Sequence, residues 1–229
     1  MLGVAEDTRA VRRRDPEMTR SSILDAAQEC LARDGAEGVS VSGVAKVAGV
    51  NRGTAYQHFQ SKESLIQATL DRVSRQLCET VFGDVSRAEE FIGASRNISE
   101  IVKGIATFSH RLAEFTIEHP DMSRIWLYDV LSREQPEQDP FYKRFLQGLH
   151  AFANSGLCDP DMDPEALAVT ILSGYFMWPV LVAAKVKTAK DRRDQARRMA
   201  REVLRMQCVG VFDISDVKLM RSLLDAEFV

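Results

Sequence analysis

The chain has 229 residues with a net charge of −3, and 45% of them are hydrophobic and 28% charged. This composition is ordinary for a soluble globular protein that is long enough for two domains. It gives no global basic signal for nucleic acid, so any DNA-binding interpretation must rest on a motif. The four cysteines are far apart and form no CxxC pair, which is typical of reduced thiols in a cytoplasmic protein rather than of a disulfide framework.

The N-terminal residues 1–18 show no hydrophobic periodicity and contain the run Arg12-Arg13-Arg14. We expect a disordered arm, and its beginning does not have the pattern of a secretory signal peptide. Arginine-rich arms can enter the minor groove of DNA. A solvated leader without a binding role explains the same residues, and the sequence leaves both interpretations open.

The next stretch predicts a helix followed by a helix-turn-helix. The first helix is expected over Arg20–Asp34, with Gly35 as its stop. Ser40 is an N-cap type, and the apolar stripe behind it predicts a short helix that Gly49 ends. Asn51 is a fresh N-cap for a second short helix whose inner face carries Ala55 and Phe59. Two helices joined by so short a turn make a helix-turn-helix.

The second short helix presents its polar residues outward, as a recognition helix does when its N-terminal residues read bases in the major groove. Arg52 suits guanine O6 and N7, and Thr54 can pack its methyl group on thymine. Gly53 costs about 1 kcal/mol relative to Ala as a helix former. Close approach of the backbone to the groove explains it, and so does plain tolerance near a helix end.

A long ungapped motif connects this stretch to a known family. The pattern runs A45-x-x-A48-G49-V50-x-x-G53-T54-x-Y56-x-H58-F59-x-S61-K62-E63-x-L65. It resembles the signature of tetracycline-repressor-type (TetR family) transcriptional regulators, over about residues 19 to 70. The rest of the chain is similar to the family only in length and in its helical layout.

The resemblance implies which residues meet double-stranded DNA. Asn51, Arg52, Gly53 and Thr54 would address bases or the adjacent backbone. Contacts to phosphate and sugar fix register rather than sequence, and the residues implied for that role are Ser40, Ser42, Tyr56, Gln57, His58 and Lys62. Tyr56 packing inside the small domain is the alternative for that residue. Lys62 stands in the first turn of a helix, against the helix dipole, and a nearby phosphate would remove that conflict.

The remaining sequence predicts only helices, with no alternating strand pattern and no internal repeat. The fold class is therefore all-α, with a disordered arm (1–18), a helix-turn-helix domain (19–65) and a larger helical domain (66–229). The helices expected after the motif span residues 62–82, 97–119, 120–130, 141–154, 166–184, 189–209 and 215–226. By the resemblance, the larger domain binds a small effector and forms a homodimer.

The helix Ala166–Ala184 carries no charged residue. It is long enough to span a bilayer, but polar residues and a proline interrupt it, so we expect no membrane contact. A helix that is apolar all round is otherwise buried in an interior or an interface. The resemblance pairs it with the helix that follows, and residues 164–187 and 189–209 are expected to hold the dimer through positions such as Val182 and Val203.

An effector pocket is expected beside Pro179, because a proline inside a helix leaves the carbonyl of Tyr175 without its usual donor. Such pockets are mostly apolar with a few placed polar groups. The residues proposed to line it are Phe108, His110, Leu112, Met122, Ile125, Trp126, Tyr175, Phe176, Met177 and Trp178. The ligand would be aromatic or lipid-like, with one hydroxyl or carbonyl group met by His110 or Tyr175, and Arg111 leaves an anion open. A filled core is the alternative.

No catalytic residue, metal site or cofactor is indicated. The four histidines show no HExxH and no clustering with carboxylates, and no GxSxG, P-loop or GxGxxG occurs. The sequence therefore indicates a DNA-binding repressor that a ligand releases, and not an enzyme. A regulator or activator without a small ligand, and a ligand-binding protein with a vestigial DNA domain, are the rival interpretations.

Overall fold

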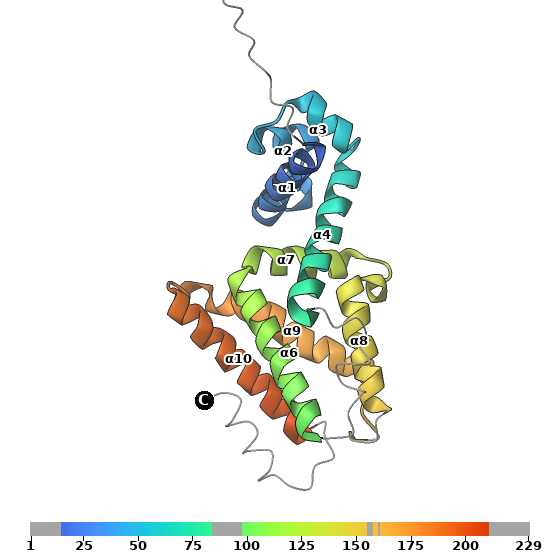
Figure 1. Ribbon diagram of the computed structural model, residues 1–229, viewed down its shortest axis with the longest axis vertical. Coiled ribbons are helices and arrows are strands. Elements are labelled where there is room, and N and C mark those ends of the chain that lie inside the picture. The colour runs from blue at the N-terminus through green and yellow to red at the C-terminus, as the bar shows by residue number, and fades with distance from the viewer. Residues whose placement is uncertain (1–14, 84–97, 155–157, 160, 211–229) are drawn as a thin grey trace, which may run out of the picture. The chain divides into compact units, whose positions relative to one another are not determined.

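The computed structural model describes residues 15–83, 98–154, 158–159 and 161–210 (Figure 1). All the regular elements in these ranges are helices, which confirms the predicted all-α class. The chain divides into two compact units, Met1–Thr69 and Leu70–Val229. The division falls inside a helix, slightly later than the boundary after residue 65 that the sequence suggested.

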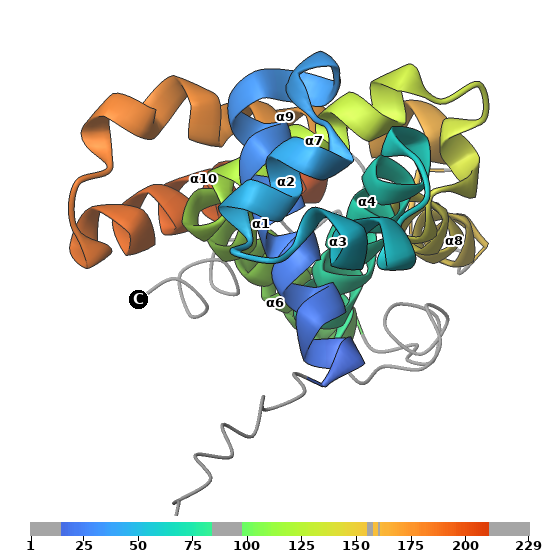
Figure 2. The ribbon, with the colours of Figure 1, turned by 90° about the horizontal axis from the view of Figure 1, so that it is seen from above.

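The first unit contains α1 (Pro16–Gly38), α2 (Val41–Val47), α3 (Arg52–His58) and the start of α4 (Lys62–Phe82). Figure 2 shows α2 and α3 joined by their short turn, with α2 packed on α1. The core of this unit includes side chains that are at most 2% exposed, such as Ile23, Val44, Ala55, Phe59 and Leu65. The apolar stripes predicted for these helices are thus the buried faces.

The helix α1 begins earlier than predicted. Residues 16–18 were assigned to the disordered arm, but they form its first turn. Asp15 is the N-cap, its carboxylate accepts from the backbone N–H of Glu17 at 3.0 Å, and Pro16 is at the first helical position. Proline is favoured there because its missing N–H has no helical partner anyway. Gly35 breaks the helix with φ of +67°, and helical residues continue to Gly38. The arginine run lies outside the described residues.

The start of α4 is fixed within the first unit by two serines and a lysine. The Ser61 hydroxyl accepts from the backbone N–H of Ser64 at 3.1 Å, and the Ser64 hydroxyl accepts from the N–H of Ser61 at 3.2 Å. This reciprocal pair has the logic of a capping box. The Lys62 ammonium donates to the backbone carbonyl of Glu37 at 3.4 Å and lies 3.7 Å from the Glu37 carboxylate.

The second unit is built from the rest of α4 and from helices close to their predicted bounds. They are α6 (Ile98–Glu118), α7 (Pro120–Ser132), η1 (Pro136–Gln138), α8 (Pro140–Ala153), α9 (Pro164–Val182), η2 (Ala183–Lys185) and α10 (Ala189–Gly210). The helix expected at 215–226 lies outside the described residues.

Burial raises the pKa of the Cys78 thiol to about 12, and Cys30 and Cys158 are buried, so these cysteines serve as core residues.

Aromatic side chains fill the core of the second unit. Trp126 stacks on Phe176 with ring centroids 4.1 Å apart, and it meets the edge of Phe141 at 5.5 Å. Phe108 stacks on Phe145 at 5.2 Å. Offset-stacked and edge-to-face pairs of this kind add to the stabilisation that burial alone gives. Aromatic packing between α6, α7, α8 and α9 therefore holds this unit together.

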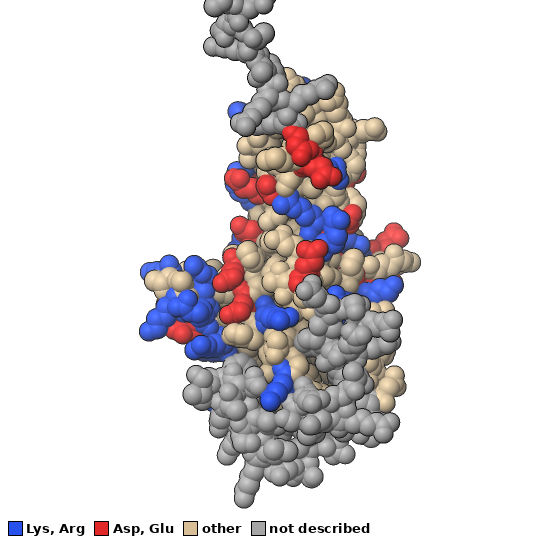
Figure 3. All heavy atoms as spheres, viewed as in Figure 1, with Lys and Arg blue, Asp and Glu red and all other residues tan. Residues whose placement is uncertain are grey.

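The two C-terminal helices differ in what they expose. Among the residues of α9 on the surface are Val169 at 55%, Met177 at 46%, Val180 at 45% and Leu181 at 68% exposure. Half of the exposed residues of α10 are arginines, and Lys and Arg side chains gather over its start and the η2 turn before it (Figure 3). Among the described residues of this unit, α9 therefore carries the largest group of exposed apolar side chains, and Tyr128 and Leu131 on α7 and Met206 on α10 are exposed as well.

The segment Pro164–Lys185 is long and apolar enough to cross a membrane, judged by length and composition within the described residues, with a mean hydropathy of 1.8. Its residues at the α6 and α7 side, such as Ile171, Tyr175 and Phe176, are buried in the protein core. Pro179 is buried as well, and α9 continues past it to Val182. A core helix with one exposed face accounts for these features.

Candidate functional site

The helix-turn-helix is set by its two caps and one glycine, as the sequence predicted. The Ser40 hydroxyl accepts from the N–H of Gly43 at 3.1 Å, and the Asn51 side-chain oxygen accepts from the N–H of Gly53 at 2.8 Å. Gly49 has φ of +64°, in the left-handed region that favours glycine. These local contacts determine where α2 ends and where α3 begins.

The structure gives a reason for a glycine at position 53 that the sequence analysis did not identify. A Cβ atom at this position would lie 3.3 Å from the Asn51 side-chain oxygen, closer than most side chains approach. The small residue therefore gives the capping side chain room to reach the backbone N–H. Gly53 is also exposed, so its backbone stays accessible at the surface of α3.

Arg52, Tyr56 and Ser42 form a cluster on the outer face of the helix-turn-helix. The guanidinium carbon of Arg52 lies 5.5 Å from the centroid of the Tyr56 ring, within cation–π distance. The hydroxyls of Ser42 and Tyr56 are 3.5 Å apart. The Ser42 hydroxyl, and then Arg52, lower the pKa of the Tyr56 phenol. Tyr56 is 38% exposed, so it does not pack inside the domain.

The other residues expected to meet DNA lie around this cluster with different exposure. Ser40, Asn51 and Gln57 are exposed, whereas Thr54 and His58 are half-buried. Lys62 is half-buried and bound to Glu37, as described above. The Lys62 ammonium therefore already has a protein carbonyl and a carboxylate as partners, and its place in the first turn of α4 does not require a phosphate. The structure thus exposes Arg52, Tyr56 and Gln57 on α3, with Asn51 and Ser40 exposed at the helix caps.

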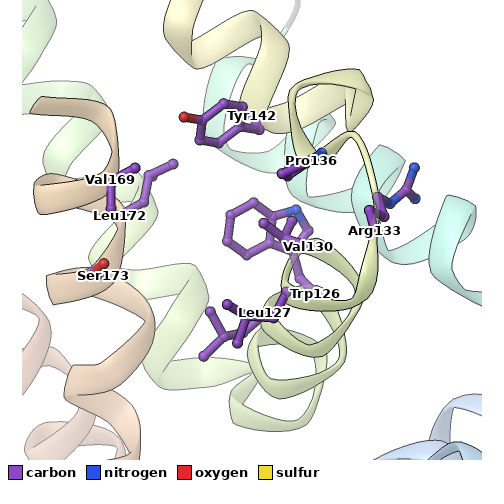
Figure 4. A pocket seen from close by; sticks show the side chains of 10 residues that line it. Trp126, Leu127, Val130, Arg133, Pro136, Tyr142, Val169, Leu172 and Ser173 are labelled. Atoms are coloured by element: carbon purple, nitrogen blue, oxygen red, sulfur yellow. The ribbon is translucent and has the colours of Figure 1, made fainter. Parts of the chain in front are cut away.

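A cavity of about 330 Å³ opens in the second unit between α7, α8 and α9 (Figure 4). Its wall is mostly apolar. In Figure 4 the α9 side chains lie opposite those of α7, with Tyr142 of α8 near one end. The lining residues are Trp126, Leu127, Val130, Leu131, Arg133, Pro136, Tyr142, Val169, Leu172 and Ser173.

The polar groups of this cavity are few. Ser173 and Tyr142 supply hydroxyls, and burial, followed by the nearby Glu165 and Glu137, raises the pKa of the Tyr142 phenol. This phenol is therefore a hydrogen-bond donor at neutral pH. The Arg133 guanidinium already donates to the Asp129 carboxylate at 2.6 and 2.9 Å. The cavity suits a small apolar molecule with one or two polar atoms.

Trp126 is the one residue of the proposed ligand set that lines this cavity. Others of that set, namely Phe108, Leu112, Met122, Ile125, Tyr175 and Phe176, are buried in the core. Met177 is 46% exposed on the outer face of α9, away from the interior where the sequence analysis placed it. Trp178 donates from its indole nitrogen to the carbonyl of Gln195 at 3.2 Å and so packs on α10. For most of these positions the filled-core alternative describes what the structure shows.

Neither of the two polar partners proposed for a ligand lies in the cavity wall. His110 is partly exposed, and its imidazole lies 3.2 Å from the Glu114 carboxylate. Tyr175 is fully buried, and burial raises the pKa of its phenol, with Ser109 acting in the opposite direction. The residues of the cavity itself come from three successive helices and the turn between α7 and α8, so no pattern within a single helix marks them.

One buried carboxylate stands behind the cavity wall. Asp139 has no exposed surface and is the N-cap of α8. One of its oxygens accepts from the Trp126 indole nitrogen at 3.1 Å and from the backbone N–H of Tyr142 at 2.9 Å. The other accepts from the Ser74 hydroxyl of α4 at 2.8 Å. Sequence analysis assigned Asp139 to a polar loop and missed this role.

Comparison with known proteins supports the assignment of the first unit. The profile described as "Bacterial regulatory proteins, tetR family" matches residues 23–69, and such regulators are generally DNA-binding proteins without enzymatic activity. The HTH-type transcriptional regulator TtgR of Pseudomonas putida is 40% identical over 53 residues, which are 23% of this chain and 25% of the relative. The match therefore spans only about a quarter of that relative. Across the described residues, no group of three or more His, Cys, Asp or Glu is placed to hold a metal ion.

Solved structures extend the similarity over both units. A gamma-butyrolactone receptor (ArpA-like protein) aligns with a TM-score of 0.61 and 20% identity over 93% of this chain and 98% of its own. A complex of SmeT, the repressor of a Stenotrophomonas maltophilia multidrug efflux pump, with triclosan aligns with a TM-score of 0.58 and 18% identity, covering 86% and 93%. At this identity the likeness shows the shared fold. The profile match places the N-terminal domain in the tetR family of bacterial regulatory proteins, and the chain as a whole shares the fold of these solved structures.

Proposed function

We propose that this protein is a homodimeric transcriptional repressor that binds a palindromic DNA operator and releases it when a small apolar effector occupies the cavity between α7, α8 and α9. The observation that carries the DNA-binding part is the exposed polar face of α3, centred on Arg52 and Tyr56. A recognition helix reads bases from such a face. The effector part rests on the cavity and on the similarity of the chain to tetR-family regulators.

The roles of the individual side chains follow from their geometry. Arg52 reads a base, because it is exposed in the first turn of α3 and its guanidinium fits guanine O6 and N7. Asn51 and Ser40 cap helices through their oxygens and can still donate to the DNA backbone from their N–H and O–H groups. Contacts to phosphate or sugar are proposed for Ser42, Tyr56, Gln57, His58 and Lys62, with Gly53 and Thr54 facing the groove.

Base reading by Arg52 predicts a loss of specificity. In an in vitro selection from random duplexes, the wild type is expected to return a palindrome with two half-sites. Arg52→Ala should lose about 1–3 kcal/mol of binding free energy and its preference at one base pair in each half-site. Lys62→Ala should weaken binding to all sequences to a similar degree, because phosphate contacts carry no sequence information.

Two results would contradict this assignment. Selection with Arg52→Ala that returns the wild-type consensus would remove Arg52 from the base-reading set. Recovery of no duplex by the wild type would reject the DNA-binding function itself. Thermal melting of Lys62→Ala serves as the control, because Lys62 also binds Glu37 and a loss of folding would imitate a loss of phosphate contacts.

The dimer is proposed to form through the exposed apolar face of α9. Val182 and Val203, which the sequence analysis placed in the subunit contact, are only 3% and 4% exposed and belong to the core of the single chain. Leu181 and its exposed neighbours on α9 take their place. A two-fold axis brings the same patch of both subunits together, and exposed apolar surface of this kind marks interaction sites. The basic outer face of α10 is less suited to self-association, since like charges would meet.

The effector is proposed to be an uncharged or weakly polar molecule, aromatic or lipid-like. The Tyr142 phenol or the Ser173 hydroxyl would meet its hydroxyl or carbonyl oxygen, in place of His110 and Tyr175. The names of similar proteins support this chemistry, since one is a gamma-butyrolactone receptor and another forms a complex with triclosan. Both are small, largely apolar molecules with an oxygen function.

Occupation of the cavity predicts a change in the fluorescence of one tryptophan. The chain has two tryptophans, and Trp126 lines the cavity whereas Trp178 packs on α10. Titration with triclosan and with a gamma-butyrolactone is expected to quench the wild type and Trp178→Phe alike, and to leave Trp126→Phe unchanged. Circular dichroism checks that each variant is folded. Quenching that survives in Trp126→Phe but disappears in Trp178→Phe would place the ligand elsewhere.

A further inference from the structure

The buried Asp139 carboxylate joins three helices at one point. Its donors are the Ser74 hydroxyl on α4, the Trp126 indole on α7 and the backbone N–H of Tyr142 at the start of α8. Ser74 and Asp139 have no exposed surface, and Trp126 is 3% exposed. Water therefore does not reach this group of atoms to replace a lost partner.

Two of these donors, Trp126 and Ser74, lie on helices with different roles. The Trp126 ring forms part of the cavity wall. Ser74 lies on α4, one uninterrupted helix from Lys62 to Phe82 whose first turns belong to the unit that carries α3. A single carboxylate thus connects the wall of the proposed effector site to the helix that continues into the DNA-binding unit.

The hydrogen bonds of Asp139 couple the movements of Trp126, Asp139 and Ser74. A buried donor that loses its acceptor keeps the full cost of its desolvation, and buried polar groups are accordingly almost always paired. If a ligand shifts the Trp126 indole, Asp139 must follow it or leave a donor unpaired. When Asp139 moves, the same requirement applies to Ser74 and hence to α4.

A second buried carboxylate, Asp129, is also hydrogen-bonded to a residue of the cavity wall. Arg133 also lines the cavity and donates to the buried Asp129 carboxylate. Burial raises the pKa of Asp129, Arg133 opposes that rise, and Asp139 and Asp71 add to it. Asp71 lies on α4, one turn before Ser74. The Asp71 and Asp139 carboxylates, on α4 and at the start of α8, therefore both act on the Asp129 carboxylate of α7.

From this geometry we propose that Asp139 is a positioning residue that transmits occupation of the cavity to α4, through Trp126 on one side and Ser74 on the other. The inference rests on the proposed function and names the atoms by which the effector site regulates DNA binding. Because coupling between two sites is reciprocal, DNA bound at α3 must also change the surroundings of Trp126. That effect can be measured without knowing the natural effector.

The experiment follows the Trp126 indole N–H by ¹⁵N–¹H NMR in protein labelled at tryptophan nitrogen. Trp178→Phe is the parent chain, so that one indole signal remains. The probe is the duplex recovered by selection with the wild type. Binding of this duplex is expected to shift the Trp126 signal in the parent. Adding Ser74→Ala should abolish the shift while the duplex still binds in a gel-shift assay.

Two further variants separate transmission from packing. Asp139→Asn keeps the geometry, since an amide oxygen accepts from Trp126 and the amide N–H₂ donates to the Ser74 oxygen, and it is expected to retain the shift. Ser123→Ala is the matched control, because Ser123 is a buried α7 serine whose hydroxyl donates to the backbone carbonyls of His119 and Thr116 and not to Asp139. It too should retain the shift.

The outcomes distinguish the inference from the function on which it depends. A bound duplex that leaves the Trp126 signal unchanged in the parent would overturn the role of Asp139 while the DNA-binding function stands. That role is equally overturned if Ser74→Ala keeps the full shift, or if Ser123→Ala loses it as well. Failure to select any duplex would overturn the proposed function and the coupling with it.

Discussion

Replacement of Leu181 by Asp is expected to convert the protein from a dimer into a monomer at micromolar concentration. Leu181 is 68% exposed on α9, and two-fold symmetry places it in the interface twice. Burial of a leucine side chain contributes about 1.5–3 kcal/mol, so loss of both copies costs about 4 kcal/mol, or about a thousandfold in the dimer dissociation constant. DNA affinity should fall with it, because a monomer reaches only one half-site.

Sedimentation velocity measures the change in oligomeric state, and a gel shift with the selected duplex measures its consequence for DNA binding. Tyr128→Asp is the control, because Tyr128 is a large exposed side chain at 49% on α7 and not on α9. It is expected to leave the dimer intact. A wild-type protein that sediments as a monomer without DNA would refute the arrangement, as would a Leu181→Asp variant that remains dimeric.

Asp139→Ala is expected to destabilise the second unit by about 3–5 kcal/mol, through loss of the α8 cap and through two buried donors, on Ser74 and Trp126, left without an acceptor. Asp139→Asn should cost about 1 kcal/mol, because it keeps the cap and the contacts but loses their charge assistance.

Urea unfolding followed by tryptophan fluorescence reports on this unit alone, since Trp126 and Trp178 both belong to it. The variants must be compared at equal protein concentration, because dimerisation adds to apparent stability. If Asp139→Ala and Asp139→Asn unfolded at the same urea concentration, the three hydrogen bonds would contribute little and the carboxylate would not hold α4 and α7 together.

The helix-turn-helix could be predicted from the sequence because its determinants are local. Ser40 and Asn51 cap helices that begin at the next residue, and Gly49 adopts the backbone angle that only a few residue types favour. The start of α1 carried an equally local signal, Asp15-Pro16, which is a cap followed by a favoured first residue. Its position beside an arginine run led to an assignment of disorder instead.

The cavity and the buried carboxylate could not be predicted in the same way. The cavity is the space that α7, α8 and α9 leave between them, and its lining residues follow no single helical period. Asp139 sits in a run of prolines and charges typical of a loop, yet its partner Ser74 is 65 residues away. Which aromatic residues fill the core and which line the cavity depends equally on such distant contacts. Hence Trp126 was placed in the wall, whereas Met177 was expected inside and lies on the surface.

The helix α4 is long enough that a small rotation at one of its attachments displaces the other attachment noticeably. Its first turn is tied by Ser61, Ser64 and Lys62, and further along it Ser74 is tied to Asp139. At about 1.5 Å per residue, Lys62 is about 18 Å from Ser74 along the helix axis, so a tilt of about 5° at Ser74 moves Lys62 by about 1.5 Å. Hydrogen bonds tolerate a range of only about 0.5 Å in length. Under the proposed coupling, a rotation small enough to spare every bond around Asp139 would therefore displace the start of α4 by more than the phosphate contact proposed for Lys62 tolerates.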